Sequence, residues 1–165
     1  MGIVTAPRIP PPAVAAGALL AQYFLTRPAR GGMVRRAFAV GLLGAGVRLG
    51  ALSERRFRAA HTTVNPLHPE RGTQLVADGP YAISRNPMYL GLVCCVAAHG
   101  LWRGGLLAQV PTALLAEWLD RAQIPAEEQA LRSLHGRSYV EYCRCVPRWI
   151  GSGCANIPCG ADADR

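Results

Sequence analysis

Four apolar segments separated by arginine-rich loops constrain the fold of this chain more than any other feature. They cover residues 12–25, 37–52, 88–102 and 104–119. None of them has the polar stripe that a surface helix of a soluble protein carries. Only 17% of the residues are charged, whereas about 25% is usual in soluble domains. We therefore expect an all-α integral membrane protein with about four transmembrane helices. A soluble bundle with buried core helices is the alternative.

Several residues inside these segments carry specific expectations. Each segment is shorter than the roughly 20 residues of a full membrane crossing. Pro111 would kink the fourth segment, and Arg48 in the second either snorkels to the interface or faces a polar cavity. Gly46 and Gly50 form a GxxxG pair, which allows another helix to approach closely. A tight turn at residues 103–105 predicts an antiparallel hairpin of the last two segments.

The basic residues are all arginines, and the formal net charge is +8. They are scattered between apolar runs and form no stripe, which argues against nucleic-acid binding. The simpler interpretation is that the arginines orient the protein at an anionic membrane surface. With four spans, the loop 53–86 and the chain after residue 119 share a side with the N-terminus and hold most of the arginines. That side is expected to be cytoplasmic.

The chain after the fourth segment is predicted to form a cytoplasmic amphipathic helix over residues 126–142, which Gly136 would break or bend. Residues 146–150, VPRWI, are typical of an interfacial anchor with Trp and Arg at headgroup depth. We therefore predict one membrane domain over residues 1–150 and a disordered C-terminal tail over residues 151–165.

The six cysteines do not predict a disulfide framework. Cys94 and Cys95 are adjacent within an apolar run. The other cysteines lie in a region expected to be cytoplasmic, where thiols stay reduced; they are Cys143, Cys145, Cys154 and Cys159. Their irregular spacing does not match a zinc site, and no metal site is predicted. Metal binding through these late cysteines is an alternative function.

Two polar clusters flank the hairpin. The first is GPYAISRNPMYLG, residues 79–91, and the second is IPAEEQAL, residues 124–131. Ionisable groups at membrane depth are costly and indicate a functional site. For the acid pair Glu127 and Glu128, simple charge complementarity at a helix N-terminus after Pro125 is the alternative. Four spans would bring both clusters to the same membrane face, where we expect them to hold one charged cofactor.

These clusters resemble two ordered blocks of the isoprenylcysteine carboxyl methyltransferase family, which is itself similar to the phospholipid methyltransferases. GPYAISRNPMYLG resembles the block GPY-x-x-x-R-H/N-P-x-Y-x-G. IPAEEQALRSLHGRSYVEYCRCVPRWI resembles the C-terminal pattern that begins with the acid pair and ends near V-P/R-R, and HTTVNPLHPERGTQLV resembles the loop before the first block in bacterial members. The resemblance covers residues 57–150. Two blocks in the right order are a stronger signal than either alone.

The resemblance implies a membrane-embedded enzyme that uses S-adenosylmethionine. Its methyl group would pass to a carboxylate, or a similar nucleophile, of a lipidic or small acceptor. The expected location is a bacterial inner membrane, with membrane lipids as partners and the site facing the cytoplasm. A non-catalytic membrane scaffold that binds a lipid or a partner is the alternative.

The resemblance also assigns roles by position. Arg121 and Gln123 would position the acceptor: an arginine grips a carboxylate bidentately, and Gln123 is closer to the family's substrate-side position. Asn86 stands where many relatives have histidine, so this chain has no imidazole to protonate there. The residues assigned to the cofactor are Thr73, Gln74, Leu75, Val76, Tyr81, Asn86, Pro87, Met88, Tyr89, Glu127 and Glu128.

Overall fold

The structure, a computed structural model, describes residues 9–27, 32–59 and 75–150. The described residues form helices and connecting turns, so the all-α prediction is confirmed for this part of the chain. The α-helices are α1 (Pro11–Leu25), α2 (Met33–Ala59), α3 (Pro87–Arg103), α4 (Val110–Trp118), α5 (Ile124–His135) and α6 (Arg137–Cys145). The shorter elements are the 3₁₀ turns η1 (Gly79–Ala82) and η2 (Leu106–Gln109) and the π-helical turn η3 (Leu119–Gln123).

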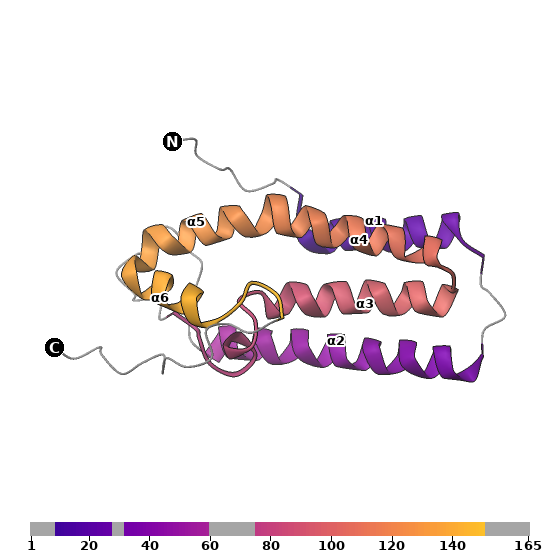
Figure 1. Cartoon of the computed structure of the whole chain (residues 1–165), viewed down its shortest axis with the longest axis horizontal. Helices are drawn as coiled ribbons and strands as arrows, with labels where there is room; N and C mark the ends of the chain where they lie inside the picture. Colours follow the sequence, from indigo (N-terminus) through magenta and orange to yellow (C-terminus); the bar gives the residue numbers. More distant parts are fainter. Residues whose placement is uncertain (1–8, 28–31, 60–74, 151–165) are drawn as a thin grey trace.

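Helix α3 is the centre of the bundle. It packs along α2 on one side and against α1 and α4 on the other (Figure 1). The predicted antiparallel hairpin of α3 and α4 is confirmed. Its turn contains Gly104 and Gly105, whose φ angles of 84° and 87° lie in the region that side chains rarely adopt. Beyond the turn, α4, η3 and α5 follow one another without a break and form one long rod (Figure 1).

The contact between α2 and α3 depends on glycines. A Cβ atom on Gly46 would lie 2.8 Å from the carbonyl oxygen of Gly91. One on Gly91 would lie 2.7 Å from the carbonyl oxygen of Gly46 and 3.1 Å from the nitrogen of Gly50. The close helix approach predicted from Gly46 and Gly50 is therefore confirmed, and the partner is α3 of the same chain.

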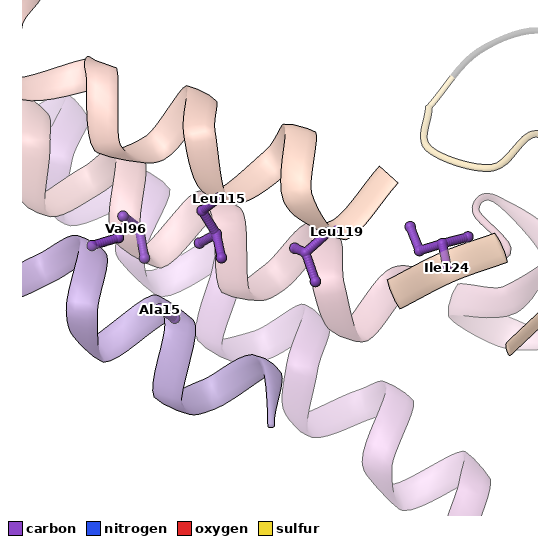
Figure 2. Packing of buried hydrophobic residues seen from close by; sticks show 6 residues of the cluster. Ala15, Val96, Leu115, Leu119 and Ile124 are labelled. Carbon is purple, nitrogen blue, oxygen red and sulfur yellow. The ribbon is translucent and has the colours of Figure 1, made fainter. Parts of the chain in front are cut away.

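The apolar core fills the space between α1, α3 and the long rod. Figure 2 shows Ala15, Val96, Leu115, Leu119 and Ile124 along this interface, and all five are at least nine-tenths buried. Leu119 begins η3 and Ile124 begins α5, so the core continues to the end of the bundle where the second polar cluster begins. The core thereby fixes the direction in which the rod leaves the bundle.

A buried polar network also crosses the core. The Gln22 amide nitrogen of α1 lies 2.8 Å from the Ala108 carbonyl, 3.0 Å from the Thr112 hydroxyl and 3.2 Å from the Val96 carbonyl. Its amide oxygen lies 2.7 Å from Nδ1 of His99. Unpaired polar groups are costly in a core without water. The network therefore fixes the rotation and height of α1 against α3 and α4.

Replacing Gln22 by leucine tests this role. The variant leaves the Thr112 hydroxyl and the His99 ring without their buried partner, and we expect the free energy of unfolding to fall by about 1–3 kcal/mol. Unfolding in detergent followed by circular dichroism measures it. The control is Leu20→Ala, on the exposed face of the same helix, where a change within about 0.5 kcal/mol is expected. Equal losses in both variants would contradict the role of the network.

Helix α2 is long and apolar enough to cross a membrane by length and composition. It has 27 residues, its mean hydropathy reaches 1.3 over 18 residues, and 17% of that window is buried inside the protein. The predicted segment 37–52 lies inside α2, which also takes up the arginines on either side; Arg48 is exposed on it. Helix α1 is apolar but has 15 residues, and α3 has 17. Among the described helices, length and composition therefore identify one candidate span, α2, whereas the sequence predicted about four.

Two element boundaries differ from the sequence prediction. Residues 104–119 do not form one α-helix: they contain η2, α4 and the first residue of η3. Pro111 lies in the first turn of α4, where its missing N–H costs little, and does not kink the helix. The break predicted at Gly136 is confirmed, because its φ of 54° ends α5, but the helical residues on either side of it extend over 124–145 and not 126–142. The tail 151–165 lies outside the described residues.

Candidate functional site

The two polar clusters meet at one end of the bundle. Tyr89, in the first turn of α3, donates its hydroxyl proton to Oε1 of Glu127 on α5. The Gln123 amide nitrogen donates to the same oxygen at 2.6 Å. The prediction that these two stretches of chain come together is therefore confirmed.

Two prolines explain why these side chains lie where they do. Pro87 is fully buried at the start of α3, which places Tyr89 in its first turn. Pro125 lacks the N–H that would bond to the carbonyl four residues earlier, and its ring crowds that carbonyl. The helix widens into the π-helical turn η3 just before it, as helices do where the regular hydrogen-bond ladder is interrupted. The wider turn leads into α5 with Gln123 and Glu127 in contact.

Tyr81 lies close to this pair. Burial and the negative charge of Glu127 raise the pKa of Tyr81 to about 12. The Tyr81 carbonyl accepts a 2.6 Å hydrogen bond from the Tyr142 hydroxyl, and burial raises the pKa of Tyr142 as well. Both phenols stay protonated at neutral pH and act as donors, not as bases. We call Tyr81, Tyr89, Gln123 and Glu127 the tyrosine–acid cluster.

The tyrosine–acid cluster is rich in acceptors. The two hydrogen bonds described above both use one oxygen of the Glu127 carboxylate. Oε1 of Gln123 is buried and has no hydrogen-bond partner among the described residues. Carboxylate and amide oxygens bind N–H and O–H donors, and a carboxylate also attracts positive charge. The cluster therefore suits a ligand that is cationic or rich in such donors.

A second group of charges lies beside this cluster. Arg148 binds both carboxylate oxygens of Glu128, at 3.1 and 2.8 Å, and Oδ1 of Asp120 at 3.1 Å. The Trp149 indole donates to the same Asp120 oxygen at 2.8 Å, and Arg85 lies 3.0 Å from Glu128. We call Arg85, Asp120, Glu128, Arg148 and Trp149 the arginine–acid network.

The charges of this network compensate one another. Hydrogen bonds to Glu128 and Asp120 raise the pKa of Arg148, which stays charged. Burial alone would raise the pKa of the Asp120 carboxyl, but the bonds from Trp149 and Arg148 outweigh it and hold that pKa below its usual value. Glu128 is almost fully buried, and a buried carboxylate persists where cations pair with it. The charge of Glu128 is therefore compensated within the protein, whereas Glu127 has no cationic partner in the part of the chain that the structure describes.

The other residues predicted for the cofactor take varied positions. Leu75 packs against the buried Tyr139 and Tyr142. Val76 and Met88 are half-buried. The side-chain amide of Asn86 donates to the Arg148 carbonyl at 3.1 Å. Thr73 and Gln74 lie outside the described residues.

The two residues predicted to position the acceptor are separated by the structure. Gln123 lies in the tyrosine–acid cluster. The side chain of Arg121 is 78% exposed and pairs with Glu117, one turn earlier, at 2.6 Å. The π-helical turn directs these near neighbours in sequence to different surroundings.

The structure gives residues 146–150 a role that the sequence did not predict. Expected as an anchor at headgroup depth, this segment turns Arg148 and Trp149 toward Asp120 and Glu128. The acid pair could have indicated these contacts from the sequence, because carboxylates beside an apolar helix need cationic partners. The expectation of reduced late cysteines is wrong for Cys145, which is disulfide-bonded. Spacing along the chain does not reveal which cysteines lie within bonding distance.

Comparison with known proteins assigns the chain to a family. The model of the phospholipid methyltransferase family matches residues 34–138, more than half of the chain. The chain belongs to this family. The matched range contains the whole tyrosine–acid cluster and ends before Arg148. This is a family of membrane methyltransferases that use S-adenosylmethionine.

One curated relative carries a more specific name. The chain is 30% identical over 81 residues to protein-S-isoprenylcysteine O-methyltransferase B of Arabidopsis thaliana. The match covers 49% of this chain and 41% of the relative, so less than half of that protein's length is represented. No solved structure matches the chain. The resemblance to isoprenylcysteine and phospholipid methyltransferases seen in the sequence is thereby confirmed.

Proposed function

We propose that this phospholipid methyltransferase family member is a membrane-embedded S-adenosylmethionine-dependent methyltransferase. It resembles the isoprenylcysteine carboxyl methyltransferases and transfers a methyl group to a carboxylate, or a similar nucleophile, of a lipidic or small acceptor. The observation that supports it best is the contact of Tyr89 and Gln123 with Glu127, which joins the two blocks of the family pattern in one site.

The tyrosine–acid cluster fits the proposed cofactor chemically. S-adenosylmethionine carries an ammonium group, ribose hydroxyls and a positive sulfonium. Glu127 and the unpaired Oε1 of Gln123 would accept its N–H and O–H donors, and the protonated hydroxyl of Tyr81 would donate to its carboxylate. Val76 and Met88, both half-buried, and Leu75 would pack on the adenine.

The protein's part in the reaction is positioning and exclusion of water. When bound, S-adenosylmethionine supplies an electrophilic methyl group on its sulfonium. The acceptor nucleophile must be held in line with it at near-attack distance in a water-poor site. Gln123 is better placed for this than the exposed Arg121, because it belongs to the cluster. Leu119 and Ile124, both fully buried, close the apolar side against water.

The membrane arrangement belongs to the same proposal. α1, α2, α3 and the α4 region would form four spans, with the tyrosine–acid cluster facing the cytoplasm, where the cofactor is made. A lipidic acceptor would enter sideways from the bilayer. Large apolar side chains exposed on three of these regions support contact with lipid: Leu20, Phe24, Phe38, Val47, Leu107 and Leu114.

The test uses membranes that contain the full-length protein, incubated with S-adenosylmethionine carrying a labelled methyl group. We expect label to be transferred to an extractable acceptor, in excess over membranes without the protein. A methyl ester releases its label as volatile methanol in mild base, whereas a methylated amine or thioether does not. Release in base is the result expected for a carboxylate acceptor.

The other outcomes are equally informative. Base-stable label would keep the methyltransferase and replace the carboxylate by an amine or a thiol. Cofactor binding by calorimetry without any labelled product would favour the non-catalytic scaffold. Failure of purified protein in detergent to bind S-adenosylmethionine would overturn the proposal.

A further inference from the structure

Three residues of the tyrosine–acid cluster are joined by hydrogen bonds near the end of the bundle. Tyr89 follows the loop of residues 84–86, Gln123 ends η3, and Glu127 lies in the first turn of α5. Because η3 and α5 are continuous, the distance that can vary is that from Tyr89 to the other two residues, and it depends on how the loop is held against η3 and α5.

Arg148 contacts the same three segments. Its guanidinium binds Glu128, next to Glu127 in α5, and Asp120, three residues before Gln123 in η3. Its backbone carbonyl accepts hydrogen bonds from the Asn86 amide and the Ser84 hydroxyl, both at 3.1 Å.

Neighbouring backbone contacts reinforce this attachment. The Arg85 amide donates to the Pro147 carbonyl at 2.9 Å. Ser84 is 1% exposed, and its hydroxyl also accepts a 3.1 Å hydrogen bond from the backbone N–H of Asn86. The segment of residues 146–150 is therefore bonded to the loop through its backbone and to η3 and α5 through side chains.

These contacts leave Asn86 and Glu128 engaged within the protein. One N–H of the Asn86 side chain is bonded to the Arg148 carbonyl, and the Glu128 carboxylate is shared between Arg148 and Arg85. Glu128 would have to give up these ion pairs to bind a cofactor directly, and Asn86 would have to keep its bond to Arg148 while doing so. Glu127 has no cationic partner among the described residues and is free of that cost.

We propose that Asn86 and Glu128 are positioning residues that act through Arg148. They fasten residues 146–150 across the loop, η3 and α5, and so fix the spacing of Tyr89, Gln123 and Glu127. The residues that would touch the cofactor are those of the tyrosine–acid cluster. This proposal rests on the proposed function for its effect on the cofactor, but not for the attachment itself.

The test combines two measurements on full-length protein in detergent. Calorimetry gives the affinity for S-adenosylmethionine, and amide hydrogen exchange without cofactor follows the peptide that contains Arg85, whose N–H is bonded to Pro147. For Asn86→Ala and Glu128→Gln we expect exchange at Arg85 to be about tenfold faster and affinity to be about tenfold lower.

Matched variants separate positioning from other effects. Asn86→His keeps a side-chain N–H donor, so it should restore both the protection of Arg85 and the affinity. Glu54→Gln makes the same exchange of acid for amide in an exposed pair with Arg58 and should change neither. Exchange of the α2 and α3 peptides at the wild-type rate shows that the bundle is intact. If Asn86→Ala fails this check, Ser84→Ala takes its place; it removes one bond to the Arg148 carbonyl together with the acceptor of the Asn86 backbone N–H.

Each outcome decides the matter. Lower affinity with Arg85 exchanging at the wild-type rate would make Asn86 and Glu128 direct ligands and overturn the proposal. Unchanged affinity together with faster exchange would overturn their link to the site. If the wild-type protein binds no S-adenosylmethionine while Arg85 exchange responds as expected, the proposed function fails and the attachment through Arg148 stands.

Discussion

Replacing Glu127 by glutamine is expected to lower the affinity for S-adenosylmethionine by about 100-fold. The change keeps the size of the side chain and removes the negative charge that faces a cationic ligand. It also replaces the carboxylate oxygen on which Tyr89 and Gln123 converge by a neutral amide oxygen, which is a weaker acceptor. Calorimetry in detergent measures the affinity, and the rate of methyl transfer to native membranes should fall in parallel.

The control for this experiment is again Glu54→Gln, an identical change at an exposed position on α2, which should bind like the wild type. Circular dichroism melting confirms that the variants remain folded. The decisive variant combines Glu127→Ala with Tyr89→Ala, because it removes both side chains of the contact between α3 and α5 in the tyrosine–acid cluster. Wild-type affinity in that double variant would disprove the assignment of the site to the tyrosine–acid cluster.

Replacing Gly91 by alanine is expected to destabilise the bundle by about 1–3 kcal/mol. The added Cβ would lie 2.7 Å from the Gly46 carbonyl oxygen and 3.1 Å from the Gly50 nitrogen. Both are backbone atoms of a helix, so neither can turn aside as a flexible side chain would. Gly46→Ala meets the Gly91 carbonyl at 2.8 Å and should cost a similar amount in unfolding measurements.

Helix α2 also supplies a control for which the opposite change in stability is expected. No atom lies within 4 Å of a Cβ built on Gly41 or Gly44. There, glycine to alanine should be neutral or stabilise by up to about 1 kcal/mol, because alanine is the better helix former. Equal effects at Gly91 and Gly44 would show that α2 and α3 do not approach through their glycines in solution.

The sequence identified the parts of the site that have a local signal. Tyr89 and Glu127 belong to motifs with characteristic spacing, and apolar segments with a glycine turn between them predicted the hairpin that separates these residues. The GxxxG pair predicted a close helix contact because the absence of a Cβ is written in the sequence itself. Gln123 could be named from the family pattern, but its contact with Glu127 depends on the π-helical turn.

What the sequence by itself determined is the helical class, the family and the pairing of two polar clusters, since each follows from composition, period or motif. The tertiary structure decided the rest. It showed that Glu128 pairs with Arg85 and Arg148, whereas Glu127 has no cationic partner among the described residues, and that Arg121 pairs with Glu117. Adjacent residues on a helix point in different directions, and the side chains they contact come from distant parts of the chain. These contacts arise from packing in three dimensions, which a pattern along the sequence does not describe.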